Sequence, residues 1–181
     1  MNYLIILFLT LLNGAFALSE LALASSKKSR LLRMADAGDK GAAAAAKLLD
    51  DPTAFLSSVQ VGITSIGILN GIVGEAAFSG GVAETLMVYG MPDTTAPIVA
   101  TALVVAAITF VTIVFGELVP KRIGQLYPEA VARYVAIPMT LVARFAHPFV
   151  VLLSSTTHFV LRLLRVDNKA SQVVTEEEIQ A

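Results

Sequence analysis

The sequence has no cysteine and only two histidines among its 181 residues. Without cysteine, the chain can form neither a disulfide framework nor a thiolate metal site. Two histidines are too few for an imidazole metal cluster, so any bound metal must be a hard cation with oxygen ligands. The sequence also lacks a nucleophile–base arrangement, a phosphate-binding loop and zinc-ligand spacing, and we therefore expect no enzymatic activity.

Charged residues are scarce as well. They make up 15% of the chain, whereas hydrophobic residues make up 56%. Soluble domains carry about 25% charged residues, so this composition indicates an integral membrane protein that contacts a lipid bilayer. The formal net charge of −1 argues against nucleic-acid binding, which needs a basic patch.

Three apolar stretches are long enough to cross a bilayer, at about residues 3–24, 54–77 and 96–117. The first has an alternative reading as a cleaved signal peptide, because Ala15-Phe16-Ala17 looks like a cleavage site. However, the chain start lacks the basic residues of a signal peptide. Lysines and arginines follow the first span, whereas the loop at 79–95 has none. The positive-inside bias thus predicts a multi-pass protein of the cell (inner) membrane with its N-terminus outside and its C-terminus cytoplasmic.

The connections carry helix and turn signals. The alanine-rich segment 41–49 predicts a helix on the cytoplasmic side. Asp50-Asp51-Pro52 predicts the start of the next helix, with an aspartate cap and a proline in the first turn. Ser79-Gly80-Gly81 predicts a break after the second span, and Met91-Pro92-Asp93 predicts a turn before the third.

Residues 128–166 are apolar, but four arginines interrupt them, at positions 133, 144, 162 and 165. This pattern favours a juxtamembrane belt of amphipathic helix at the cytoplasmic interface, bent at Pro138 and Pro148. The alternative is a fourth crossing by residues 145–164, which would put the C-terminus outside. Residues 167–181 are polar and contain a helix start, and we expect them to form a linker.

The third span ends on Phe115-Gly116-Glu117-Leu118-Val119-Pro120-Lys121-Arg122. A carboxylate at the end of a span is costly without a partner and marks a functional site by default. Glycine and proline both weaken the helix there, and the carbonyls they free can face an ion. Glu20 lies at the corresponding end of the first span, with an alternative role as a helix-end residue paired with Lys121 or a nearby arginine.

The second span contributes small and polar residues. Gly67-Ile-Leu-Asn-Gly71 is a GxxxG motif, which predicts close approach of helices in lipid. Its hydroxyl residues have an alternative role, in which they bond back to their own helix. If the three spans converge, they supply the six or so oxygens that a hard divalent cation requires. The candidate metal-site residues are Ser19, Glu20, Ser65, Asn70, Gly116 and Glu117.

Three segments carry a family resemblance: Phe16-Ala-Leu-Ser-Glu-Leu-Ala-Leu, Gln60-Val-Gly-Ile-Thr-Ser-Ile-Gly-Ile-Leu and Val114-Phe-Gly-Glu-Leu-Val-Pro-Lys. Together they resemble the transmembrane domain of the CNNM/CorC (HlyC/CorC) family. The resemblance implies an all-α integral membrane fold over residues 1–166, with three transmembrane helices plus cytoplasmic-side juxtamembrane helices. It also implies a homodimer, and a linker at 167–181 towards a cytoplasmic CBS-pair region.

The resemblance further implies export of magnesium or another divalent cation, with sodium as the coupling ion and ATP bound only by the CBS region. The family's ion site uses polar side chains of the first two spans and the glycine–glutamate pair of the third. Carried over to this sequence, it points to Ser19, Ser65, Gly116 and Glu117, and secondarily to Glu20 and Asn70.

The second span departs from the family pattern. Magnesium-binding members often show Gly-Asn-Thr-Leu-Val-Asn where this chain has Gly62-Ile-Thr-Ser-Ile-Gly67, so both amides are missing. Residues 71–79 and 120–124 look closer to a branch that exports diamines such as putrescine and cadaverine. Carboxylates at Glu20, Glu75 and Glu117 suit two ammonium groups. The sequence thus predicts a magnesium exporter, with a diamine exporter or a non-transporting anchor for a regulatory CBS module as the alternatives.

Overall fold

The computed structural model describes residues 2–163, apart from the side chains of residues 53, 54, 147, 154 and 158. The expected linker at 167–181 and the last residues of the belt lie outside this range. The described part of the chain is helical and contains no strand, which confirms the all-α prediction. Its elements are α1 (Asn2–Ser25), α2 (Lys28–Asp36), α3 (Lys40–Leu48), α4 (Pro52–Val88), α5 (Ala96–Ile113), the π-helical turn η1 (Val114–Leu118), α6 (Val119–Leu126) and α7 (Pro128–Leu163).

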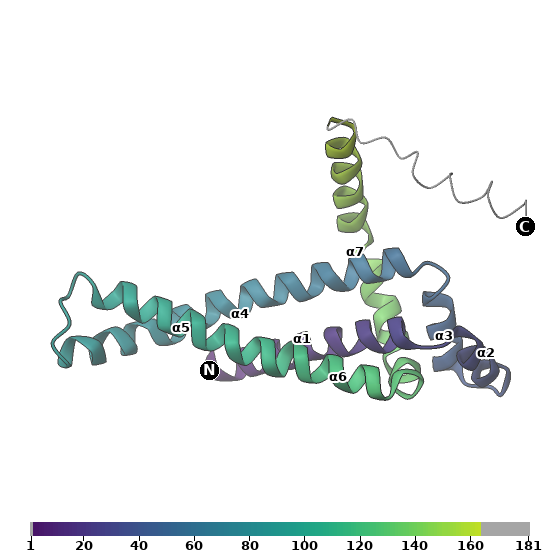
Figure 1. Ribbon diagram of the computed structural model, residues 1–181, viewed down its shortest axis with the longest axis horizontal. Helices are drawn as coiled ribbons and strands as arrows, with labels where there is room; N and C mark the ends of the chain where they lie inside the picture. Colours follow the sequence, from purple (N-terminus) through teal and green to yellow (C-terminus); the bar gives the residue numbers. More distant parts are fainter. Residues whose placement is uncertain (1, 164–181) are drawn as a thin grey trace, which may run out of the picture.

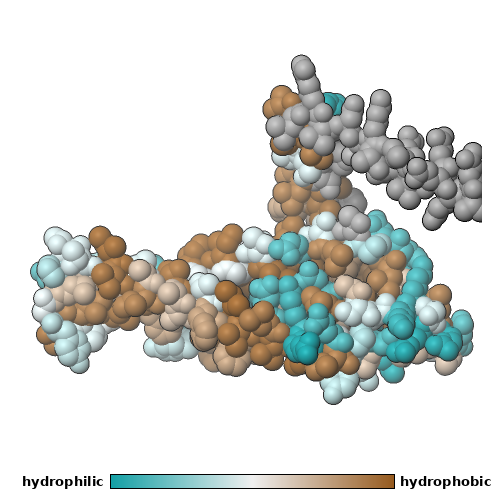
Figure 2. Space-filling view, in the orientation of Figure 1, coloured by the Kyte–Doolittle hydropathy of each residue, from teal (hydrophilic) through white to brown (hydrophobic). Residues whose placement is uncertain are grey.

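Three helical segments are long and apolar enough to cross a membrane: Asn2–Ser25, Phe55–Val88 and Ala96–Leu126. The third comprises α5, η1 and α6 in continuous succession. Figure 1 shows α5 lying alongside α4, and α6 alongside α1. Hydrophobic residues cover much of the long helices, and hydrophilic residues gather at the end where α2 and α3 lie (Figure 2). The chain is therefore a multi-pass membrane protein, and each of the three predicted spans coincides with one of these helical segments.

The second span is longer than predicted, because α4 continues through Ser79-Gly80-Gly81 to Val88. The expected break at this triplet was wrong. A glycine inside a helix costs only about 1 kcal/mol relative to alanine, and it keeps both of its backbone hydrogen-bonding groups. The helix ends instead at Val88. Gly90 follows with a φ of +92°, in a turn in which the Met91 N–H donates to the Leu86 carbonyl at 3.1 Å.

The two short helices α2 and α3 form a separate layer against the first half of α7. The alanine-rich helix was predicted, and Asp39 caps it by accepting hydrogen bonds from the Gly41 and Ala42 N–H groups. Asp39 also pairs with Arg133 of α7 at 2.9 Å, and Arg30 of α2 lies 3.4 Å from Glu129. Sequence reasoning missed α2, a nine-residue helix whose one buried residue is Leu31.

Helix α7 confirms one of the two predicted bends. Its segments Pro128–Ala146 and Pro148–Leu163 meet at 52°, because a proline ring removes a helical hydrogen bond and clashes with the preceding turn. Figure 1 shows the second segment projecting away from the three long helices. Taken together, the two segments are long and apolar enough for a fourth crossing, so both arrangements considered for this region stand.

Candidate cation site between the three spans

The predicted irregular backbone lies at η1, the π-helical turn that contains Gly116 and Glu117. There the Val119 N–H donates to the Val114 carbonyl five residues earlier, the spacing that defines a π-helix. Pro120 has no N–H to give to the Gly116 carbonyl four residues before it. That carbonyl instead accepts a hydrogen bond from Asn13 Nδ2 of α1, at 2.8 Å.

Helix α1 approaches this turn closely because glycines line the contact. A Cβ atom added to Gly116 would lie 3.2 Å from both Asn13 Nδ2 and the Thr10 carbonyl oxygen. One added to Gly124 would lie 2.7 Å from the Leu18 carbonyl oxygen. The contact between α1 and the η1–α6 segment therefore depends on the absence of side chains at these two positions.

A second polar contact joins all three spans. Asn70 of α4 is completely buried, and its Nδ2 donates to Thr10 Oγ1 of α1 at 3.0 Å and to Thr112 Oγ1 of α5 at 2.7 Å. The Oδ1 atoms of Asn70 and of Asn13 are buried and have no hydrogen-bond partner within the described residues. Buried oxygens of this kind are normally satisfied, so these two are available to a ligand or to water.

A cavity of about 210 Å³ opens next to these contacts. Its polar wall consists of Asn13, Thr109, Thr112 and Glu117, and three isoleucines, Ile63, Ile108 and Ile113, form part of its apolar wall. The remaining lining residues are Gly67 and Gly71, where an added Cβ would meet no neighbouring atom within 4 Å. The GxxxG motif therefore leaves space for the cavity at these positions and makes no close helix contact there.

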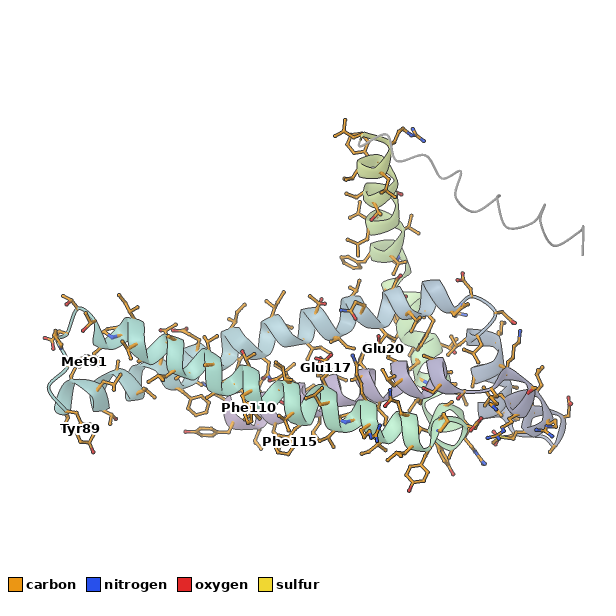
Figure 3. All side chains as sticks on the ribbon, viewed as in Figure 1. Glu20, Tyr89, Met91, Phe110, Phe115 and Glu117 are labelled. Atoms are coloured by element: carbon orange, nitrogen blue, oxygen red, sulfur yellow. The ribbon has the colours of Figure 1, made fainter. Side chains whose placement is uncertain are left out.

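The carboxylate of Glu117 is paired with an ammonium group. Lys121 Nζ lies 2.8 Å from Glu117 Oε1 and 3.2 Å from Glu20 Oε2, so a single lysine joins α1, η1 and α6. Figure 3 shows both glutamates in the space between α4 and the α1–α6 pair. The role considered for Glu20 as a partner of Lys121 is thus observed.

Glu20 lines a separate and larger cavity, of about 580 Å³. Helices α4 and α7 form most of its wall, including Ser57, Gln60 and Thr157, and Glu20 supplies its acidic group. Each of the two carboxylates bound to Lys121 therefore lines its own cavity.

Comparison with known proteins decides the family. The sequence profile of the Cyclin M transmembrane N-terminal domain (CNNM) matches residues 4–181. This chain belongs to the CNNM family.

The relatives of this CNNM domain include transport proteins. It is 44% identical to UPF0053 protein sll0260 of Synechocystis over 175 residues, which are 97% of this chain and 39% of that protein. It is 32% identical to the polyamine export protein of Salmonella typhimurium over 182 residues, which are 100% of this chain and 40% of that protein. UPF0053 protein YugS of Bacillus subtilis is 29% identical over 168 residues, 92% of this chain and 39% of that protein. The chain thus spans about two fifths of the length of these relatives.

Within the CNNM domain, four of the six predicted site residues lie at the two polar contacts or beside them. Gly116 and Glu117 form η1, Asn70 joins the spans, and Glu20 reaches Glu117 through Lys121. The two predicted serines lie apart from the small cavity.

Ser19 and Ser65 have different surroundings. The buried Ser19 hydroxyl donates to the Ala15 carbonyl of its own helix at 2.6 Å, the local bonding considered for the hydroxyls of the second span. Ser65 lies on an exposed face of α4. Neither serine lines the cavity beside Glu117.

Sequence reasoning missed Thr10, Asn13 and Thr112. The first two carried a readable signal, because Thr10, Asn13 and Glu20 recur at spacings of three and seven residues and so share one face of α1. The third predicted carboxylate of the diamine hypothesis, Glu75, accepts a hydrogen bond from Thr101 of α5 at 3.2 Å and does not line the cavity.

Proposed function

We propose that this chain is the membrane domain of a cation exporter, and that its role is transport and not catalysis. The observation that carries the proposal is the position of Glu117 in the wall of a cavity between three spans. The wall adds amide and hydroxyl oxygens to this carboxylate, and all of these groups attract cations. Carboxylates within membrane spans are costly and mark the pathways of transported ions or substrates.

A diamine is the substrate that we favour. Lys121 already holds a primary ammonium group between Glu20 and Glu117, which supports an ammonium ion as the fitting ligand. The isoleucines of the cavity wall suit the methylene chain of a diamine. The polyamine export protein of Salmonella typhimurium, at 32% identity, supports the same substrate class.

Magnesium is the second candidate, supported by the buried oxygens of Asn13 and Asn70 that have no hydrogen-bond partner within the described residues. Magnesium binds through one or two carboxylates and keeps several waters. The described residues contain no group of three or more acidic or histidine side chains placed to hold a metal ion, so magnesium would bind here through one or two carboxylates, amide oxygens and water. The homodimer, the sodium coupling and the ATP-binding CBS region remain proposals for the whole protein.

The test is flux through liposomes that contain the intact protein, measured with putrescine and separately with magnesium. We expect Glu117→Gln to lower putrescine flux about tenfold or more, because a hydrogen bond to a charged group is worth roughly 1.5–3 kcal/mol. The matched control is Glu84→Gln, the same change at an exposed carboxylate of α4, which should leave flux unchanged.

Each outcome selects one function. Putrescine flux that depends on Glu117 supports the diamine exporter. Magnesium flux that depends on Glu117, without putrescine flux, makes magnesium the substrate. If neither flux responds to the substitution, the anchor for a regulatory module replaces the exporter.

A further inference from the structure

The ammonium group of Lys121 occupies a position that a transported cation also favours. It lies within 3.2 Å of two carboxylates that come from different helices. Their two contacting oxygens are therefore no more than about 6 Å apart, the sum of 3.2 Å and 2.8 Å. Without a cation between them, two carboxylates this close repel one another in surroundings of low dielectric constant. Lys121 therefore neutralises the pair while no other cation is present.

The same lysine contacts one residue from the wall of each cavity. Glu117 lines the 210 Å³ cavity, and Glu20 lines the 580 Å³ cavity between α1, α4 and α7. Because Lys121 contacts both carboxylates, its ammonium group links one acidic group from the wall of each cavity.

The contacts of Lys121 are of a kind that can be exchanged. The three side chains are partly exposed, at 26% for Lys121, 18% for Glu20 and 35% for Glu117. A lysine ammonium is a point charge on a flexible stem of four carbons, so it can swing away without unfolding the helix.

We propose that Lys121 is an intramolecular competitor for the transported cation. Its ammonium group holds Glu20 and Glu117 while no other cation is bound, and the transported cation displaces it from these two carboxylates. The Glu20 cavity is then a second place where the cation can bind, with a carboxylate, two hydroxyls and an amide in its wall. This inference rests on the proposed cation export, and it adds the residue that controls access to the site.

A competing Lys121 and a purely structural Lys121 predict opposite changes in cation affinity when the lysine is removed. If Lys121 only held the helices together, its removal would loosen the site and weaken cation binding. If it competes, its removal tightens cation binding. Arginine at this position would grip the carboxylates through two parallel hydrogen bonds and compete more strongly than lysine.

The experiment is a titration of the melting temperature of the intact protein in detergent with putrescine, and separately with magnesium chloride. We expect Lys121→Gln to bind the protecting cation roughly tenfold more tightly than the wild type, within the range typical of coupling between two ligands. Lys121→Arg should bind it more weakly. The matched control is Lys28→Gln, which removes the same charge from an exposed ion pair with Asp50 and should change nothing.

The outcomes separate this inference from the proposed function. If a cation raises the melting temperature of the wild type and Glu117→Gln abolishes this effect, the result supports the site. If Lys121→Gln then binds the cation no more tightly than the wild type does, the proposed competition is overturned while the site stands. An absence of any protection that depends on Glu117 overturns the proposed function itself. If Lys121→Gln does not yield folded protein, Lys121→Arg decides, because binding as tight as in the wild type would contradict the competitor.

Discussion

Asn13 supports the backbone of the third span next to Glu117. Its Nδ2 satisfies the Gly116 carbonyl, which Pro120 leaves without the usual helical donor. An unsatisfied carbonyl away from water is expensive, so the amide makes the π-helical turn tolerable at this depth. The π-helical turn η1 then places Glu117 in the wall of the cavity.

Replacing Asn13 by leucine should therefore destabilise the protein by about 1–3 kcal/mol, the usual penalty for leaving a buried partner unsatisfied. It should also weaken cation protection, because η1 loses its support. The melting temperature in detergent, with and without putrescine, measures both effects. Asn2→Leu, at an exposed position of the same helix, is the control and should have no effect. An unchanged melting temperature for Asn13→Leu would mean that the Gly116 carbonyl finds another donor.

At the scale of elements, the site depends on how closely α1 approaches the end of the third span. Helices in lipid associate through close packing of small residues, since lipid tails are as apolar as the side chains they replace. Gly124 meets the backbone of α1 at Leu18 and Ala22, and backbone atoms cannot rotate out of the way as a side chain can. The position of η1 against α1 follows from this contact.

Gly124→Ala should push α6 away from α1 and destabilise the protein by about 1–3 kcal/mol, as overpacking usually does. Gly80→Ala is the matched control, because a Cβ atom at that helical position meets no neighbouring atom within 4 Å. There the higher helix propensity of alanine should leave stability equal or raise it by up to about 1 kcal/mol. Equal melting temperatures for the two variants would show that α1 and α6 can move apart without loss of stability.

At the scale of the whole molecule, two ends differ in chemistry. One end carries α2, α3 and the start of α7, tied together by the ion pairs of Arg30 and Arg133. The other end is the turn between α4 and α5, which contains no lysine or arginine. Figure 3 places Tyr89 and Met91 at that end, far from Glu20. The positive-inside bias predicts that the end with α2 and α3 is cytoplasmic.

The absence of cysteine makes this orientation directly testable by single cysteine substitutions. In intact cells, a membrane-impermeant thiol reagent should label Thr94→Cys, in the turn before α5, but not Ala43→Cys, in α3. Both positions are exposed, so both should react after the membrane is opened. The reverse pattern would invert the orientation.

A cysteine at the exposed Arg162 extends this test to α7. With three crossings, we expect it to react only after the membrane is opened. Labelling in intact cells would establish a fourth crossing by the segment Pro148–Leu163.

The sequence by itself determined the helical class, the three spans and the irregular backbone at Gly116 and Glu117. These features rest on local properties: the length of apolar runs, the spacing of charges, and the loss of a backbone donor at Pro120. The sequence also determined the family, because three short motifs carry it.

Only the tertiary structure decided which side chains meet. Asn13 lies 103 positions from Gly116, and no local pattern measures such a distance. Whether a serine faces a cavity depends on the rotation of its helix, which packing sets; Ser65 is exposed for this reason, whereas Asn70 is buried. The pairing of Lys121 with two carboxylates likewise needs α1 and α6 at close range, which the missing side chain of Gly124 permits.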